Sequence, residues 1–144
     1  MRFVALIVWF VTALWGLYML AVWLIENDAT RQGESASRLP LPVILAHVLL
    51  AVTGLGVWIA YLLLDRPALA WTALGILVAI AGLGLAMFAR WIPVYSATGD
   101  EAGPGKEIPA EGNFPLLIVL AHGTFAVSTV VLVLLTALGV GVGG

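Results

Sequence analysis

The chain has 144 residues, of which 62% carry hydrophobic side chains and only 10% are charged. This composition lies far outside the range of soluble globular domains and predicts a protein of the lipid bilayer. The formal net charge is -2, with no cluster of Lys and Arg and no glycine-rich phosphate loop, so nucleic acid is not a predicted partner. The absence of cysteine excludes disulfides and thiolate metal sites.

Four long apolar stretches follow one another, at about 3–25, 39–64, 67–91 and 114–139. Each is long enough to cross the hydrocarbon core of a bilayer, which takes about 20 residues. The first is too long for the core of a signal peptide and is read as a retained helix. We therefore predict an all-α integral membrane protein with a single membrane domain over residues 1–144. Its four transmembrane helices would form an up-down-up-down bundle, multi-pass in the cell membrane, with both termini on the same side.

Polar loops are predicted at 26–38 and 96–113, on one face of the membrane. The distribution of Arg and Lys does not decide which face is cytoplasmic. Pro93 is predicted to end the third helix. Small residues allow helices in lipid to approach closely and so mark predicted helix contacts, with a tightly packed third helix. These residues are Gly54 and Gly56 in the second stretch and Gly75, Ala79, Gly82, Gly84 and Ala86 in the third.

An internal repeat carries the two histidines of the chain. When the sequence is aligned with itself so that Pro40 lies over Pro115, His47 lies over His122. This offset is close to half the chain and suggests two tandem helical hairpins, although the first and third helices do not align convincingly at it. The second and fourth helices run in the same direction, and seven residues at about 1.5 Å each place either histidine about 10 Å beyond its proline. The two imidazoles are therefore predicted at equal depth.

An ionisable side chain inside a membrane span is rare and costly, so both histidines are functional candidates. One interpretation is that each imidazole only forms a hydrogen bond to a neighbouring helix. The other is that His47 and His122 are the two axial ligands of one b-type haem. Adjacent helices lie about 8 to 10 Å apart, which is too close for an iron between two imidazoles. Diagonal helices lie about 13 Å apart, and the second and fourth helices of a sequential bundle are diagonal.

Small residues follow each histidine by one and two helical turns and would leave room for the macrocycle. They are Ala51, Gly54, Ala126 and Thr129. Arg38 and Arg90 lie at the ends of helices on the same face as the polar loops, where they could pair with haem propionates. Each arginine can equally be an ordinary interfacial anchor.

With this architecture, the chain resembles the four-helix membrane cytochromes b, in which histidines on parallel helices ligate haem within the bilayer. The resemblance covers the helical core and rests on His47, His122 and their small neighbours, with no family-specific motif around them. It implies one haem b per protomer and electron transfer as a redox subunit, with a quinone or a redox protein as partner. No motif for a further cofactor is present, so an independent enzyme is not predicted.

Other interpretations fit the sequence less closely. A transition-metal site of two imidazoles would be under-coordinated, because no intramembrane Asp, Glu, Cys or well-placed Met completes it. A proton or substrate pathway usually includes an intramembrane carboxylate, and every carboxylate of this chain lies in a loop. The main alternative is a non-enzymatic accessory or assembly subunit of a larger membrane complex, with structural histidines. The sequence also allows a homo-oligomer in which His47 of one chain faces His122 of another.

Overall fold

The computed structural model describes residues 1–30, 37–100 and 109–140, and this part of the chain is helical with short connections. Its elements are α1 (Arg2–Thr30), α2 (Leu41–Leu64), α3 (Pro67–Asp100), the 3₁₀ helix η1 (Ala110–Asn113) and α4 (Leu116–Ala137). The four α-helices are long and apolar enough to cross a membrane, which confirms the four predicted helices. These are four candidate spans, as in a multi-pass membrane protein.

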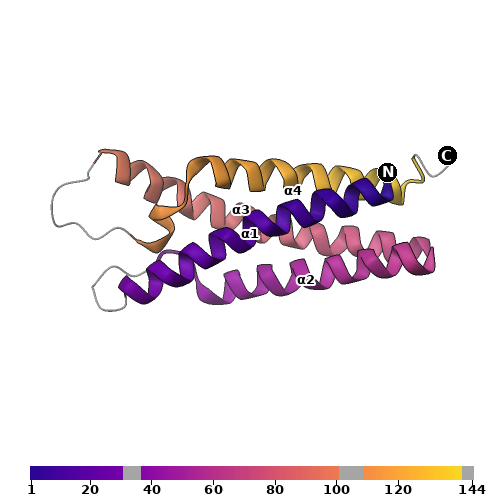
Figure 1. Ribbon diagram of the computed structural model, residues 1–144, viewed down its shortest axis with the longest axis horizontal. Helices are drawn as coiled ribbons and strands as arrows, with labels where there is room; N and C mark the ends of the chain where they lie inside the picture. The colour runs from indigo at the N-terminus through magenta and orange to yellow at the C-terminus, as the bar shows by residue number, and fades with distance from the viewer. Residues whose placement is uncertain (31–36, 101–108, 141–144) are drawn as a thin grey trace.

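The four long helices lie side by side in one elongated bundle (Figure 1). The end of α1, the start of α2, the end of α3 and the start of α4 lie together at one end, called the loop end below. The N-terminus, the α2–α3 turn and the end of α4 lie at the opposite end, the turn end. Helix α1 packs along α4, and α2 packs along α3, with further contacts between α3 and α4 and between α1 and α2. No Cα atoms come within 8 Å between α2 and α4 or between α1 and α3, so these two pairs are the diagonals.

Two helices are longer than their apolar stretches. Helix α1 continues to Thr30, and α3 continues through Pro93 to Asp100, so Pro93 does not end its helix as predicted. A proline removes only one backbone hydrogen bond from a helix. The thickness of the hydrocarbon core sets the length of the apolar stretch, and it does not set the length of the helix. The polar ends of both helices therefore extend beyond the part that is apolar enough for lipid.

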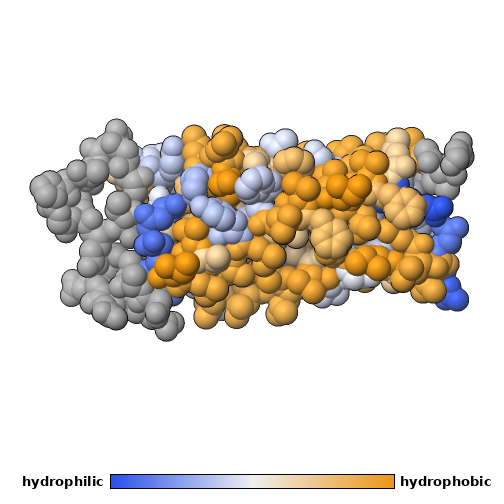
Figure 2. Space-filling model, in the orientation of Figure 1, coloured by the Kyte–Doolittle hydropathy of each residue, from blue (hydrophilic) through white to orange (hydrophobic). Residues whose placement is uncertain are grey.

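On the face shown in Figure 2, large apolar side chains cover most of the length of the bundle, and the most hydrophilic residues gather toward its two ends. Leu63 and Leu117 are 78% and 76% exposed. A surface of this kind would promote aggregation in water, whereas lipid tails cover it without cost. At the turn end, the exposed Arg2 side chain donates a hydrogen bond of 2.6 Å to Asp65, in the short connection between α2 and α3.

Two buried clusters form the core. The cluster toward the turn end contains Ala5, Trp9, Trp58, Tyr61, Ala70, Ala73, Leu77 and Val133. The cluster at the loop end contains Trp23, Leu39, Ile44, Trp91, Ala110 and Phe114. The level of His47 and His122 along the bundle lies between these two clusters.

Helices α1 and α3 also repeat, but at a different offset from the one that aligns the histidines. When Ala5 is placed over Ala73, eight residues of α1 lie over identical residues of α3. These are Ala5, Leu6, Ala13, Gly16, Leu17, Met19, Ala21 and Trp23. Ala5 and its counterpart Ala73 are both fully buried, and Trp23 and its counterpart Trp91 are 5% and 4% exposed. Because α1 packs on α4 as α3 packs on α2, the two hairpins are related by an approximate two-fold axis along the bundle.

Among the glycines predicted to mark helix contacts, Gly54 of α2 and Gly84 of α3 lie at close approaches, and Gly56, Gly75 and Gly82 do not. A Cβ atom at Gly54 would lie 3.0 Å from Ile76 Cγ2 and 3.0 Å from Trp9 Cζ2. A Cβ at Gly75 or Gly82 would meet nothing within 4 Å. The prediction of helix contacts is therefore wrong within the chain for Gly75 and Gly82, because they lie on the face of α3 opposite Ala73 and Leu77. It is also wrong for Gly56 of α2, where a Cβ meets nothing within 4 Å.

We expect Gly54→Ala to destabilise the folded protein by about 1 to 3 kcal/mol, because the added methyl group overpacks the contact with Trp9 and Ile76. Gly56→Ala is the matched control on the same helix, since a Cβ there meets nothing within 4 Å. Thermal unfolding in detergent measures both. Equal unfolding temperatures for the two variants would show that the close approach at Gly54 has no energetic consequence.

Candidate functional site: a histidine pair across the bundle

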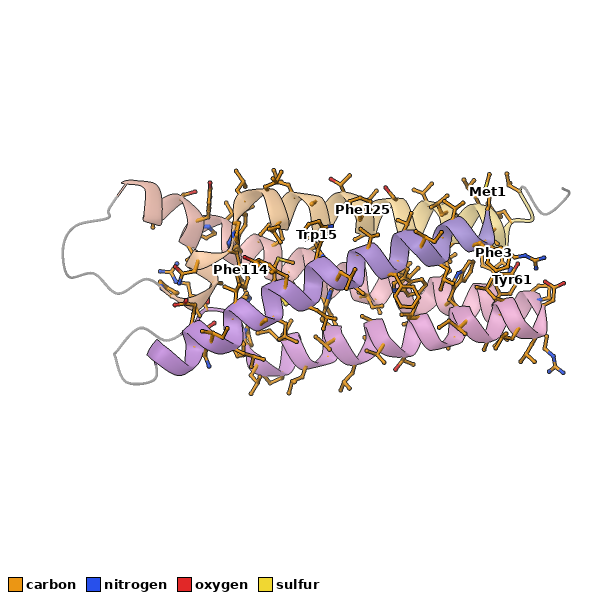
Figure 3. The ribbon with its side chains drawn as sticks, viewed as in Figure 1. Met1, Phe3, Trp15, Tyr61, Phe114 and Phe125 are labelled. Atoms are coloured by element: carbon orange, nitrogen blue, oxygen red, sulfur yellow. The ribbon has the colours of Figure 1, made fainter. Side chains whose placement is uncertain are left out.

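His47 of α2 and His122 of α4 meet across the diagonal of the bundle. Their ring centroids are 6.3 Å apart, and the ring planes are inclined by 53°. Trp15, the neighbour of Gly16, marks the level of the pair about midway along the bundle, between Phe114 at the loop end and Tyr61 toward the turn end (Figure 3). The structure therefore brings together the two residues that the repeat places in the same register.

His122 is held by the backbone of α1. Its Nδ1 lies 3.0 Å from the carbonyl oxygen of Thr12. A carbonyl oxygen only accepts hydrogen bonds, so the neutral ring makes this bond with its proton on Nδ1 and keeps a lone pair on Nε2. The same ring packs on Gly16, where a Cβ would lie 3.1 Å from its Cε1 atom.

His47 has an equivalent setting on α3. Its Cε1 would lie 3.3 Å from a Cβ built at Gly84. The backbone of Ile80 lies beside this ring, but Nδ1 of His47 is buried without a hydrogen-bond partner among the described residues. The ring of His47 is therefore held less firmly than that of His122.

The two settings are copies of one arrangement. The alignment that places Ala5 over Ala73 also places Thr12 over Ile80 and Gly16 over Gly84. Each hairpin contributes one histidine, and that histidine packs on the glycine-bearing helix of the other hairpin. Sequence reasoning named Gly84 only as a helix contact and missed Gly16 and the carbonyls, although the match of Gly16 with Gly84 could have revealed them at the correct offset.

The four small residues predicted to border a haem lie on the turn side of the histidines. Gly54 contacts Trp9, as described above. Thr129 donates a 2.8 Å hydrogen bond to the Phe125 carbonyl, and its hydroxyl lies 3.2 Å from that of Thr12. Ala51 and Ala126 are half-buried. A role for these four residues beside a cofactor remains a prediction.

Arg38 and Arg90, the predicted partners of haem propionates, come together at the loop end. Arg90 Nη1 donates a hydrogen bond of 3.4 Å to the backbone carbonyl of Arg38. With Ala89 and Pro93, the two residues line an open depression in the surface. Within the described part of the chain, neither guanidinium has a carboxylate within 4.0 Å.

A buried polar cluster that the sequence did not reveal lies beside these arginines. It consists of Ser37, the backbone of Arg38, and Glu111 of η1, bonded to the indole groups of Trp23 and Trp91. We call it the polar cap. The sequence predicted two polar loops, whereas the structure joins residues from both of them into one buried network.

The geometry gives the histidine pair a definite chemical character. Both imidazoles are partly buried in an apolar bundle, and the Thr12 carbonyl accepts the hydrogen bond from His122 Nδ1. The described structure gives neither Nε2 atom a hydrogen bond, so both are available to a ligand. Comparison with protein-family models, with curated proteins and with solved structures finds no match to this chain.

Proposed function

We propose that the protein is a b-type haem protein of the cell membrane. Its four helices cross the bilayer in alternating directions, with both termini on one side, and His47 and His122 ligate the iron of one haem b between α2 and α4. The residues of this chain bind and orient the cofactor, and the apolar bundle excludes water from it.

The separation of the two imidazoles carries this proposal. A bond from a metal ion to an imidazole nitrogen is about 2.0 Å long, and the ring centre lies about 1.1 Å further, so two imidazoles on opposite sides of one iron have centroids about 6.2 Å apart. The rings of His47 and His122 are 6.3 Å apart. Packed aromatic rings generally lie about 4.5 to 7 Å apart, so this spacing supports the proposal together with the backbone contacts of the rings.

The backbone contacts of the rings support the same interpretation. Histidines that bind metals commonly donate the hydrogen of the other ring nitrogen to a carbonyl or carboxylate, which fixes the ring and makes the ligating nitrogen more basic. The Thr12 carbonyl provides this contact for His122. The backbone of Ile80 stands in the equivalent place for His47.

The loop end supplies cations for the propionate groups. Gly84 packs against His47, and Arg90 lies six residues further along α3, about 9 Å nearer the loop end. Arg38 is next to it and also has no carboxylate partner within the described residues. Guanidinium groups bind carboxylates through paired, charge-assisted hydrogen bonds, so these two residues would hold the propionates.

Bound haem would supply one-electron transfer, which makes this chain a redox subunit and not an independent enzyme. His47 lies about 9 Å along α2 from its first residue and about 26 Å from its last. Electrons would therefore enter or leave at the loop end, where a quinone or a redox protein could approach within a short distance.

The proposal is tested by adding haem to the purified protein in detergent and recording the optical spectrum during the titration. We expect saturation at one haem per chain, an intense Soret band and a sharp alpha band after reduction. A folded protein that stays colourless with haem supplied during expression and after purification would contradict the proposal. That result would favour an accessory subunit of a larger membrane complex.

A further inference from the structure

Glu111 is a buried carboxylate to which the proposed haem site assigns no role. It lies in η1 and has no exposed surface. One carboxylate oxygen accepts a 2.6 Å hydrogen bond from the backbone N–H of Arg38, and the other accepts a 2.7 Å bond from the Ser37 hydroxyl. No cation forms an ion pair with it among the residues that the structure describes. Burial of a carboxylate is costly unless its lone pairs are bonded, so these two bonds must hold it in place.

The bonds of Glu111 extend to both tryptophans at the loop end. The Ser37 hydroxyl oxygen also accepts a 3.0 Å hydrogen bond from Trp23 Nε1 of α1. The backbone carbonyl of Glu111 accepts a 3.0 Å bond from Trp91 Nε1 of α3. The polar cap therefore ties together the end of α1, the chain before α2, the end of α3 and the chain before α4.

One connection within the cap joins the starts of two helices whose backbones do not approach each other. Helices α2 and α4 have no Cα atoms within 8 Å of each other. Arg38 lies three residues before the first residue of α2, and Glu111 lies five residues before the first residue of α4. Their hydrogen bond links these two positions. A slip of one helix by a single residue would displace its histidine by about 1.5 Å along the bundle.

We infer that Glu111 is the positioning residue of the histidine pair: its carboxylate fixes the starts of α2 and α4 at the same level, so that His47 and His122 meet ring to ring. The inference rests on the proposed function, since it assigns a residue that holds both axial ligands at the spacing an iron requires. In the alignment that places His47 over His122, the counterpart of Glu111 is Ala36, which carries no carboxylate. A single substitution therefore removes this element of the cap.

The experiment compares wild type with Glu111→Ala, Glu111→Gln and the matched control Asn113→Ala. Asn113 lies in the same 3₁₀ helix and makes an exposed hydrogen bond to Glu26. Each protein is loaded with haem and reduced, and the fraction that binds carbon monoxide is measured together with the low-spin fraction of the oxidised form. An iron with two histidine ligands has no free position for carbon monoxide, so this fraction reports separation of the pair.

We expect Glu111→Ala to bind haem but to show a several-fold larger carbon monoxide-binding fraction than wild type. Glu111→Gln should restore most of the low-spin form, because its amide oxygen can still accept the Arg38 N–H. Asn113→Ala should resemble wild type. Ser37→Ala removes one of the two hydrogen bonds to the carboxylate and should give a smaller increase in the carbon monoxide-binding fraction. This variant tests the inference if Glu111→Ala does not fold.

Two failures can be told apart. If wild type binds no haem, the proposed function is wrong, whatever the variants do. If wild type holds low-spin haem and both Glu111→Ala and Ser37→Ala match it in low-spin and carbon monoxide-binding fractions, only the role of Glu111 is wrong.

Discussion

Replacing either histidine with alanine is expected to abolish the low-spin haem spectrum. In each single variant the iron would keep one protein ligand, so haem that remains bound becomes high-spin and binds carbon monoxide. Added imidazole should restore the low-spin spectrum in both His47→Ala and His122→Ala, because it can occupy the space that the missing ring leaves. The measurement is the optical spectrum of the haem-loaded variants in the oxidised and reduced states.

Thr53→Ala is a suitable control for the histidine variants. Thr53 is exposed on α2, and its hydroxyl donates only to the Leu49 carbonyl of its own helix. Its spectrum should match that of wild type. If only one histidine variant loses the low-spin spectrum, the ligand pair is not His47 with His122, although haem binding itself would survive.

Filling the space at either glycine is expected to weaken haem binding strongly. Leucine at Gly16 or Gly84 begins with a Cβ at 3.1 or 3.3 Å from the facing imidazole, and its remaining atoms need the volume that the ring occupies. Overpacking of this kind costs about 1 to 3 kcal/mol, which corresponds to a loss of about fivefold to 150-fold in haem affinity. Competition titration with a haem acceptor protein measures the affinity.

Gly82→Leu is the matched control for Gly84→Leu. It lies two residues away on the same helix, and a Cβ there meets nothing within 4 Å. The outward face of α3 should accommodate leucine in lipid or detergent with haem affinity unchanged. An equal loss of affinity in Gly82→Leu and Gly84→Leu would mean that glycine acts through the flexibility of α3, and that its contact with His47 is unimportant.

The helices could be predicted from sequence because the length of an apolar stretch is a direct consequence of bilayer thickness. Their ends could not. Helix α3 continues through Pro93 and α1 reaches Thr30, because backbone hydrogen bonds continue where apolar side chains stop. The contacts of Gly75 and Gly82 were predicted wrongly because composition does not reveal which face of a helix is turned toward its neighbours.

The histidine pair could be predicted because proline and histidine repeat in register across two parallel helices. Gly16, the carbonyls and the place of Gly84 beside a ring escaped prediction, since α1 and α3 repeat at a different offset from α2 and α4. Glu111 escaped it for another reason. A carboxylate in a polar loop is ordinarily solvated, and only the structure shows that Ser37 and the Arg38 backbone enclose it.

The most direct test of the central claim, that His47 and His122 share one iron, is the electron paramagnetic resonance spectrum of the haem-loaded oxidised protein. Two imidazole ligands give a low-spin ferric signal with no high-spin component, and we predict that spectrum for wild type at one haem per chain. A predominantly high-spin signal would contradict the claim, because it would show an iron that lacks one of the two histidines.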